Sequence, residues 1–309
     1  MIEITKKIIM ELDNINLEGR YDNHIHCCPH INSRSLNLYD AVKDAEREKM
    51  VAIGLMDNFS VTSGYASLMN SIFKNFKVKV FGGLIMEPYA GGINPENLKT
   101  LMKYSYGDFD QVFKFVSFPT HHTQFIAKQE KRNDDYINNC FSLNDMKKAN
   151  KDVLKILDII AINKLVLNTG HLSDKESINL INLAKKHGVK KILVPANHLT
   201  KETINEINST IKVFFEFSYF FISKAANIPL THIDGEKHII HGLEKNKLSA
   251  LIKSAKTENI ILSSDCGVSV LPRPVDGLKI FISEILKLGF TIKDIDNMTK
   301  KNPQKLFYC

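Results

Sequence analysis

A short stretch near the amino end of the sequence concentrates side chains that can bind a metal ion. The segment YDNHIHCCPH, residues 21–30, holds three histidines and two cysteines. His24 and His26 are two positions apart, and in a β-strand this spacing directs both side chains to the same face. Two imidazoles on one face can bind a single divalent ion. The alternative is a pair of surface histidines in a loop. The predicted elements around the pair distinguish these two interpretations.

Eight short apolar segments recur along the chain, and helical patterns lie between them. Most are nearly continuous apolar runs, which is typical of strands buried on both faces, as in a parallel sheet. The segments are Tyr21–His24, Val51–Met56, Val78–Leu84, Val112–Phe118, Leu165–Thr169, Lys191–Pro195, Val213–Phe217 and Ile260–Ser264. Eight strand–helix units in about 290 residues predict a (β/α)8 TIM barrel in the α/β class. An open doubly wound sheet is the alternative, but no glycine-rich motif follows the first strand.

The same pattern indicates how the chain is divided. We expect residues 1–309 to form a single barrel domain that begins with a short N-terminal helix. The longest stretch without a strand, at about 121–163, leaves the fourth strand and contains a helix from about Leu143 to Ile162. The carboxyl ends of barrel strands carry the active site in such folds, so this excursion is a candidate lid or substrate loop.

Polar side chains that can bind a metal follow four of the predicted strands. His24 and His26 end the first strand, and Asp265 ends the eighth in IILSSDCG. His171 follows the fifth strand in LVLNTGH, and His198 follows the sixth in ILVPANH. The carboxyl ends of the strands converge in a closed barrel. We therefore predict that these five residues form one metal site.

This ordered set resembles the amidohydrolase superfamily of metal-dependent barrel hydrolases. The similarity lies in the H-x-H pair, the two later histidines and the final aspartate, and it extends over residues 20 to 307. The C-terminal NMTKKNPQKLF resembles the closing N-P-x-x-L helix of that superfamily. Three further segments, GGLIMEPYAGGINPENL, SFPTHH and LNTGHLSDKES, resemble an amidohydrolase-like branch of it.

The resemblance and the residue types imply a metal-dependent hydrolase. It would cleave a small-molecule amide, ester, lactone or related bond with metal-activated water, and Asp265 would be ligand and catalytic proton acceptor. One or two divalent ions are expected, with zinc first and manganese or iron as alternatives. A metal-dependent deaminase or decarboxylase of the same superfamily is the second reading. A non-catalytic metal-binding module is the third.

One position departs from the pattern of the superfamily. Two-metal members carry a bridging carboxylated lysine or a glutamate at the end of the fourth strand. Here Lys114 is the only lysine of that strand and lies near its start. Glu87 could substitute as a bridging ligand, or it could order its own loop. His121 and His122 could contact metal or substrate, and the number of ions stays open.

The composition limits the remaining functions. The chain has 44% hydrophobic residues, five cysteines and a formal net charge of +7. The lysines are scattered without a basic block, so we expect no nucleic-acid partner. No apolar run approaches 18 residues, so we expect no membrane partner. The unpaired cysteine pattern and the charged N-terminus predict a cytoplasmic protein with a small-molecule substrate, and a homo-oligomer remains open.

Overall fold

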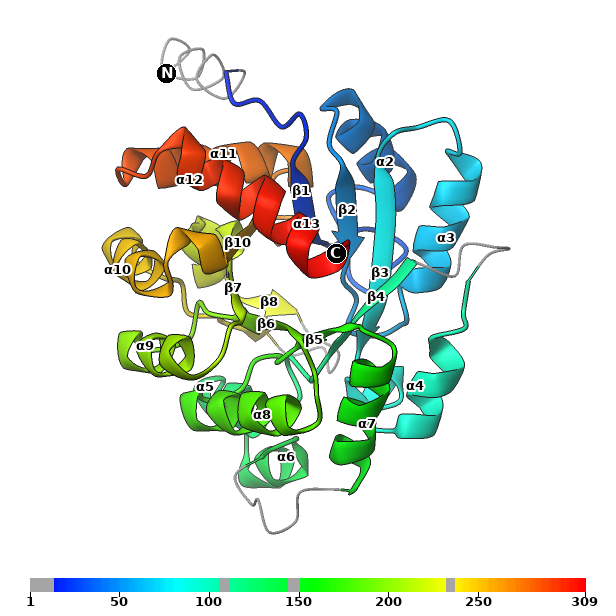
Figure 1. Ribbon diagram of the computed structural model, residues 1–309, viewed down its shortest axis with the longest axis vertical. Coiled ribbons are helices and arrows are strands. Elements are labelled where there is room, and N and C mark those ends of the chain that lie inside the picture. The colour runs from blue at the N-terminus through cyan, green and yellow to red at the C-terminus, as the bar shows by residue number, and fades with distance from the viewer. Residues whose placement is uncertain (1–13, 106–111, 144–150, 232–236) are drawn as a thin grey trace.

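Eight parallel strands form the central barrel of the protein. The computed structural model describes residues 14–105, 112–143, 151–231 and 237–309. The strands pair in the order β1-β2-β3-β4-β5-β6-β7-β10 (Figure 1). They are β1 (Tyr21–Ile25), β2 (Ala52–Leu55), β3 (Lys79–Ile85), β4 (Phe113–Ser117), β5 (Val166–Asn168), β6 (Lys191–Pro195), β7 (Phe214–Ser218) and β10 (Ile260–Ser263).

The barrel closes where the end of β10 meets β1. Ile25 pairs with Cys266 in parallel orientation, just beyond the last strand. This contact confirms the predicted (β/α)8 barrel. The alternative prediction of an open doubly wound sheet is wrong. Each predicted strand boundary lies within one residue of the observed one, because strands buried on both faces must be apolar along their whole length.

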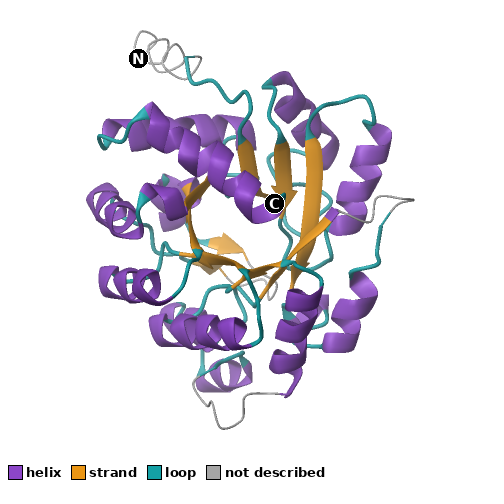
Figure 2. Cartoon of the chain, viewed as in Figure 1, coloured by secondary structure: helices purple, strands orange, loops and turns teal. Residues whose placement is uncertain are grey.

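Helices surround the barrel, and most of them cover the outer face of its strands (Figure 2). They are α2 (Leu38–Arg47), α3 (Ser63–Ile72), α4 (Pro95–Leu101), α5 (Gln124–Gln129), α6 (Asp134–Asn139), α7 (Lys151–Ile162), α8 (Asp174–Lys186), α9 (Lys201–Thr210), α10 (Lys245–Ala255), α11 (Pro274–Lys287), α12 (Ile292–Asp296) and α13 (Asn302–Phe307). A two-stranded antiparallel sheet, β8 (Leu230–Thr231) with β9 (Lys237–His238), lies in the connection after β7.

The described part of the excursion after β4 contains three helices. α5 and α6 follow the strand directly, and α7 leads back to β5. The predicted helix from about Leu143 is observed as α7 from Lys151, and residues 144–150 lie outside the described residues. The predicted N-terminal helix falls on residues 1–13, which also lie outside them.

Aromatic and aliphatic side chains fill the barrel and seal its amino end. Phe81, Phe115, Val166, Leu193 and Ile261 belong to one buried cluster that the end of α13 completes. The Phe307 ring of α13 packs 4.8 Å from the Phe81 ring between centroids. In Figure 1, α13 crosses in front of the barrel beside the C-terminus. The predicted closing helix thus covers the amino end, and the carboxyl end is left for the site.

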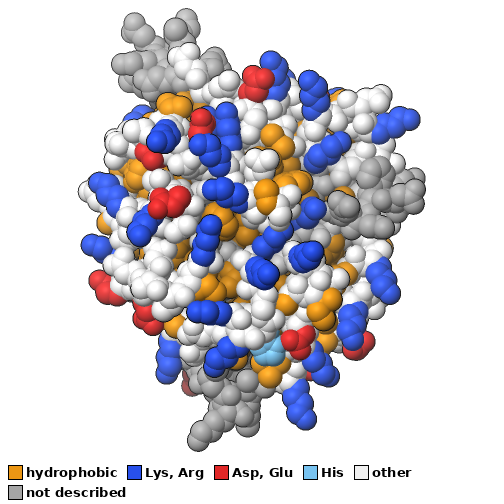
Figure 3. Space-filling view, in the orientation of Figure 1, with side chains coloured by type: hydrophobic (Ala, Val, Ile, Leu, Met, Phe, Trp, Pro, Cys, Tyr) orange, Lys and Arg blue, Asp and Glu red, His pale blue; other side chains and the backbone are white. Residues whose placement is uncertain are grey.

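Basic side chains are spread over one face of the surface. On the face shown in Figure 3, lysine and arginine side chains occur throughout, with apolar side chains and some acidic ones among them. Among the described helices, none combines the length and apolar character needed to cross a membrane.

Candidate metal centre

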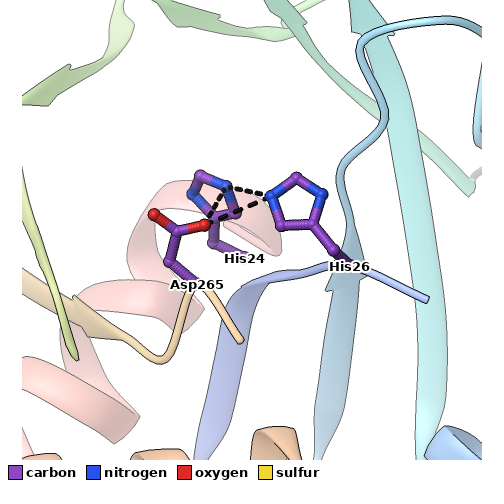
Figure 4. Close-up of side chains that lie close together, drawn as sticks. All are labelled: His24, His26 and Asp265. Carbon is purple, nitrogen blue, oxygen red and sulfur yellow. Dashed lines mark hydrogen bonds and ion pairs between the residues drawn. The ribbon is translucent and has the colours of Figure 1, made fainter. Parts of the chain in front are cut away.

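Three side chains that can bind a metal ion meet at the carboxyl end of the barrel. His24 lies on β1, His26 follows it directly, and Asp265 follows β10. The Nε2 atoms of His24 and His26 lie 3.3 Å apart, and Asp265 Oδ1 lies 3.2 Å from each (Figure 4). Within the described residues, this is the one group of three or more such side chains with ligand atoms all within 4.8 Å. We call it the ligand triangle.

The ligand triangle has the dimensions that one divalent ion requires. Zinc lies about 2.0–2.2 Å from imidazole nitrogen and carboxylate oxygen, so ligand atoms at tetrahedral angles are about 3.4 Å apart. The observed separations of 3.2 and 3.3 Å fit this value. Three protein ligands are also the number that catalytic zinc sites use, with a further position left for water or substrate.

Backbone contacts between the first and last strands fix the ligand triangle. Asp265 N–H donates to His24 O at 2.9 Å. His26 N–H donates to Cys266 O at 2.8 Å. Gly267 has a φ of +123°, and a Cβ there would lie only 1.6 Å from His26 O. Glycine therefore lets this loop approach β1 closely enough to place the carboxylate between the two imidazoles. Asp265 itself has a φ of +50°, a backbone conformation that clusters at functional sites.

The three side chains differ in how readily they hold a proton. Burial lowers the pKa of His24, but the carboxylates of Asp265 and Glu216 have a larger, opposite effect. The pKa of His24 is therefore raised to about 9. Burial lowers the pKa of His26, and here that effect prevails. Burial raises the pKa of Asp265, but its two imidazole neighbours more than offset this and hold it below the usual value. The triangle thus offers an ionised carboxylate and a proton on His24 that a cation can replace.

Glu216 is a functional candidate that the sequence analysis missed. It lies in the middle of β7, is 2% exposed, and places Oε1 3.4 Å from His24 Nδ1. A carboxylate at Nδ1 of a metal-binding histidine fixes the proton there and leaves Nε2 for the metal. Ser218, two residues later, donates to Asp265 Oδ2 at 3.4 Å. The signal was a carboxylate inside the apolar segment VFFEF, since a buried charge needs a partner.

Asp22 is a second buried carboxyl group beside the ligand triangle. Its Oδ1 accepts from Ser264 N–H at 3.0 Å and from His24 N–H at 3.4 Å. Burial raises the pKa of Asp22 to about 7. This side chain therefore ties the first strand to the last next to the ligands.

Replacing Glu216 with leucine should weaken metal binding without unfolding the barrel. The substitution removes the Nδ1 partner of His24 and leaves an apolar side chain of similar size at a buried position. Loss of such a partner typically lowers metal affinity by about 10–100-fold. Competition against a chromophoric chelator measures the change, with Glu216→Gln expected to lie between leucine and wild type. Equal affinities of all three proteins at an unchanged melting temperature would contradict the role.

His171 and His198 form a pair of imidazoles beside the ligand triangle. Their ring centroids lie 5.0 Å apart, and Phe221 packs edge-on at 4.8 Å from the His198 ring. Burial lowers the pKa of His171 to about 4 and that of His198 to about 3, so both are neutral at pH 7. Within the described residues, His198 Nε2 is buried without a hydrogen-bond partner. Neither residue belongs to the triangle, so their role as ligands stays a prediction.

Glu87 organises the loop after β4. One carboxylate oxygen accepts from the backbone N–H groups of Thr120 and His121, both at 2.7 Å. The other oxygen accepts from His122 N–H at 3.1 Å. Glu87 is 1% exposed, and these donors satisfy its carboxylate. The geometry supports the alternative in which Glu87 orders its loop, and Glu87 is not part of the triangle.

Of the remaining candidate residues, one lines the cavity and two lie away from the ligand triangle. His121 lines the cavity that contains the triangle, and its ring centroid lies 6.4 Å from that of His171. His122 instead packs against Tyr136, with 5.3 Å between ring centroids. Lys114 Nζ lies 5.3 Å from the centroid of the Tyr308 ring, which packs at the amino end of the barrel. Lys114 therefore cannot bridge ions at the triangle.

The ligand triangle opens into a cavity of about 550 Å³. This volume is within the range of small-molecule sites. Its walls combine aromatic side chains with a few polar groups. Besides the triangle, they include His30, Arg34, Asn58, Phe59, Thr120, His121, His171, Phe220 and Phe221.

Sequence comparison places the chain in a family. A model described as "Family of unknown function (DUF6282)" matches residues 19–216, which is more than half of the chain. The chain belongs to this family. The DUF6282 match contains the four histidines predicted as ligands and ends at Glu216, whereas Asp265 lies beyond it. No curated protein is matched by sequence.

Solved structures share the barrel of this DUF6282 chain. The phosphotriesterase homology protein from Escherichia coli, complexed with phosphate in its active site, is 14% identical with a TM-score of 0.60, covering 95% of this chain and 100% of that one. An amidohydrolase from Burkholderia multivorans with bound zinc is 10% identical with a TM-score of 0.58, covering 93% and 98%. A 2,6-dihydroxybenzoate decarboxylase is 8% identical with a TM-score of 0.55, covering 94% and 100%. These similarities confirm the expected (β/α)8 barrel fold.

Proposed function

We propose that the chain is a metal-dependent hydrolase of a small-molecule amide, ester, lactone or related bond. The observation that carries the proposal is the ligand triangle of His24, His26 and Asp265 in the wall of a cavity of about 550 Å³. Zinc is the expected ion, with manganese or iron as alternatives, and the similar barrel from Burkholderia multivorans contains zinc. One ion fits the triangle, and a second would need the His171–His198 pair.

The residues of the triangle have distinct roles in this chemistry. A bound ion supplies a Lewis acid and lowers the pKa of a water molecule from about 15.7 towards about 7. Asp265 would accept the proton of the attacking water and pass it to the leaving group. Its Oδ1 faces the imidazoles and its Oδ2 faces Ser218, so the carboxylate is held in one orientation. Glu216 lies beside His24 Nδ1 and would leave Nε2 free to bind the ion.

A decarboxylase or deaminase with a single ion is the second candidate. The observation that favours it is the absence of a bridging ligand among the described residues. Glu87 is engaged by backbone donors, and Lys114 lies at the other end of the barrel. The similar 2,6-dihydroxybenzoate decarboxylase also has this barrel.

Turnover of a substrate panel by metal-loaded protein tests the proposal. The panel contains esters, lactones, amides and phosphoesters, together with aryl carboxylates assayed for CO₂ and aminated heterocycles assayed for ammonia. We expect hydrolysis of at least one member, lost on chelation and restored by added zinc or manganese. Release of CO₂ or ammonia instead would favour the second candidate. Full metal occupancy without any turnover would favour a non-catalytic metal-binding module.

A further inference from the structure

One cationic side chain lines the cavity beside the ligand triangle. Arg34 is the single lysine or arginine among the described residues of its wall. It lies in the segment that connects β1 to α2, and Arg34 pairs with Val268 from the loop after β10. The next residue is also held, because Ser35 N–H donates to Gly267 O at 2.7 Å. The last strand's loop therefore fixes both Asp265 and the backbone of Arg34.

The guanidinium of Arg34 has no carboxylate partner in the described part of the chain. Its only side-chain hydrogen bond there joins Nη2 to His30 Nε2 at 2.6 Å, and its Nε is buried without a partner. Asp57 is the carboxylate that acts most strongly on it. However, Asp57 Oδ1 accepts from Phe59 N–H at 2.8 Å, and Oδ2 accepts from Ser60 Oγ at 2.9 Å. Since a half-buried cation is unfavourable without a counter-ion, a ligand anion would complete the site.

His30 does not supply that negative charge and does not add a positive one. Burial and the neighbouring guanidinium lower the pKa of His30 to about 3, so its imidazole is neutral at pH 7. Arg34 therefore supplies the positive charge of this pair, and the Asp57 carboxylate, with Oδ1 3.7 Å from His30 Nε2, offsets part of it. A guanidinium matches the two oxygens of a carboxylate in a bidentate pair.

We propose that Arg34 binds the carboxylate of a monoanionic substrate whose body is apolar or aromatic. The single charge favours a carboxylate over a dianionic phosphate. Phe59, Phe220 and Phe221 line the same cavity and provide the apolar surface for the body. The position of the reacting bond at the ligand triangle rests on the proposed function, but the carboxylate subsite itself needs no metal.

Binding of benzoate, benzamide and phenylphosphonate to the metal-free protein tests the subsite. Benzoate and benzamide have the same shape and differ in charge, and isothermal titration calorimetry at fixed ionic strength measures each Kd. We expect benzoate to bind about 10–100-fold more tightly than benzamide, because charged hydrogen bonds exceed neutral ones. Phenylphosphonate should bind more weakly than benzoate. Arg34→Met and Arg34→Gln should both abolish the preference for benzoate, and Arg34→Lys should retain part of it.

A matched control separates the subsite from the overall charge of the protein. Lys103 is exposed and does not line the cavity, so Lys103→Met should leave the benzoate preference unchanged. Equal binding of benzoate and benzamide to wild type, or a preference that survives in both Arg34 variants, would overturn the proposal. Benzoate binding that requires metal and ignores Arg34 would do the same and leave the hydrolase proposal standing. A retained Arg34-dependent preference in a protein that binds no metal would contradict only the hydrolase.

Discussion

The purified protein is expected to bind one divalent transition-metal ion, and His24→Asn combined with His26→Asn should abolish that binding. The two imidazoles and Asp265 are the ligand triangle, with separations of 3.2 and 3.3 Å between ligand atoms. Loss of a residue that only supports a ligand lowers metal affinity by about 10–100-fold. Removing two of the three ligands should lower it by more. Elemental analysis of protein expressed with added zinc or manganese gives the stoichiometry, and chelator competition gives the affinity.

The pH dependence of metal affinity provides a second readout. The pKa of His24 is raised to about 9, so this imidazole is protonated below that pH and the ion must displace its proton. The metal affinity should therefore fall as the pH is lowered from about 9.

His187 is a suitable control for the double variant, because it pairs with Asp158 on the surface at 2.6 Å. We expect His187→Asn to bind metal as the wild type does. A wild-type protein that binds no metal, or a His24→Asn, His26→Asn variant that binds as much metal as the His187→Asn control, would rule out this assignment.

Asp265→Asn should remove turnover even when metal occupancy is complete. Asparagine retains an oxygen that can contact a metal ion, but it cannot accept and transfer a proton. General acid–base catalysis contributes about 10²–10⁴-fold, or about 3–5 kcal/mol of transition-state stabilisation. We expect a loss of that size in kcat at saturating metal, measured on the substrate that the panel yields.

Comparison with the Glu216→Gln variant shows whether Asp265 acts as a proton acceptor or only as a ligand. The defect of Glu216→Gln should be one of metal affinity, so excess metal should restore most of its turnover, whereas Asp265→Asn should stay inactive. Near wild-type turnover by fully loaded Asp265→Asn would reduce Asp265 to a ligand. The base would then have to be sought elsewhere in the cavity wall, with His121 the first candidate because Glu87 is engaged by backbone N–H groups.

The strands and the first ligands were readable from the sequence for physical reasons. Strands buried on both faces are apolar throughout, so Lys191–Pro195 was predicted at its observed bounds and the other strands within one residue of theirs. The alternation of a strand directs His24 and His26 to one face whatever surrounds them. Parallel strands in a barrel end at the same rim, which brings Asp265 to this pair although it lies 239 positions after His26 in the chain.

Only the tertiary structure decided what the other polar side chains do, because their roles depend on which neighbours lie within hydrogen-bond distance. Glu87 could have been a bridging ligand or a loop carboxylate, and three backbone N–H groups at residues 120–122 favour the second role. Glu216 lies inside an apolar strand segment, and its role depends on His24 Nδ1, which lies 3.4 Å away. The Arg34 guanidinium lies in the cavity wall and, among the described residues, no carboxylate is hydrogen-bonded to it. This arrangement depends on how the segment between β1 and α2 packs against the loop after β10, which no sequence spacing encodes.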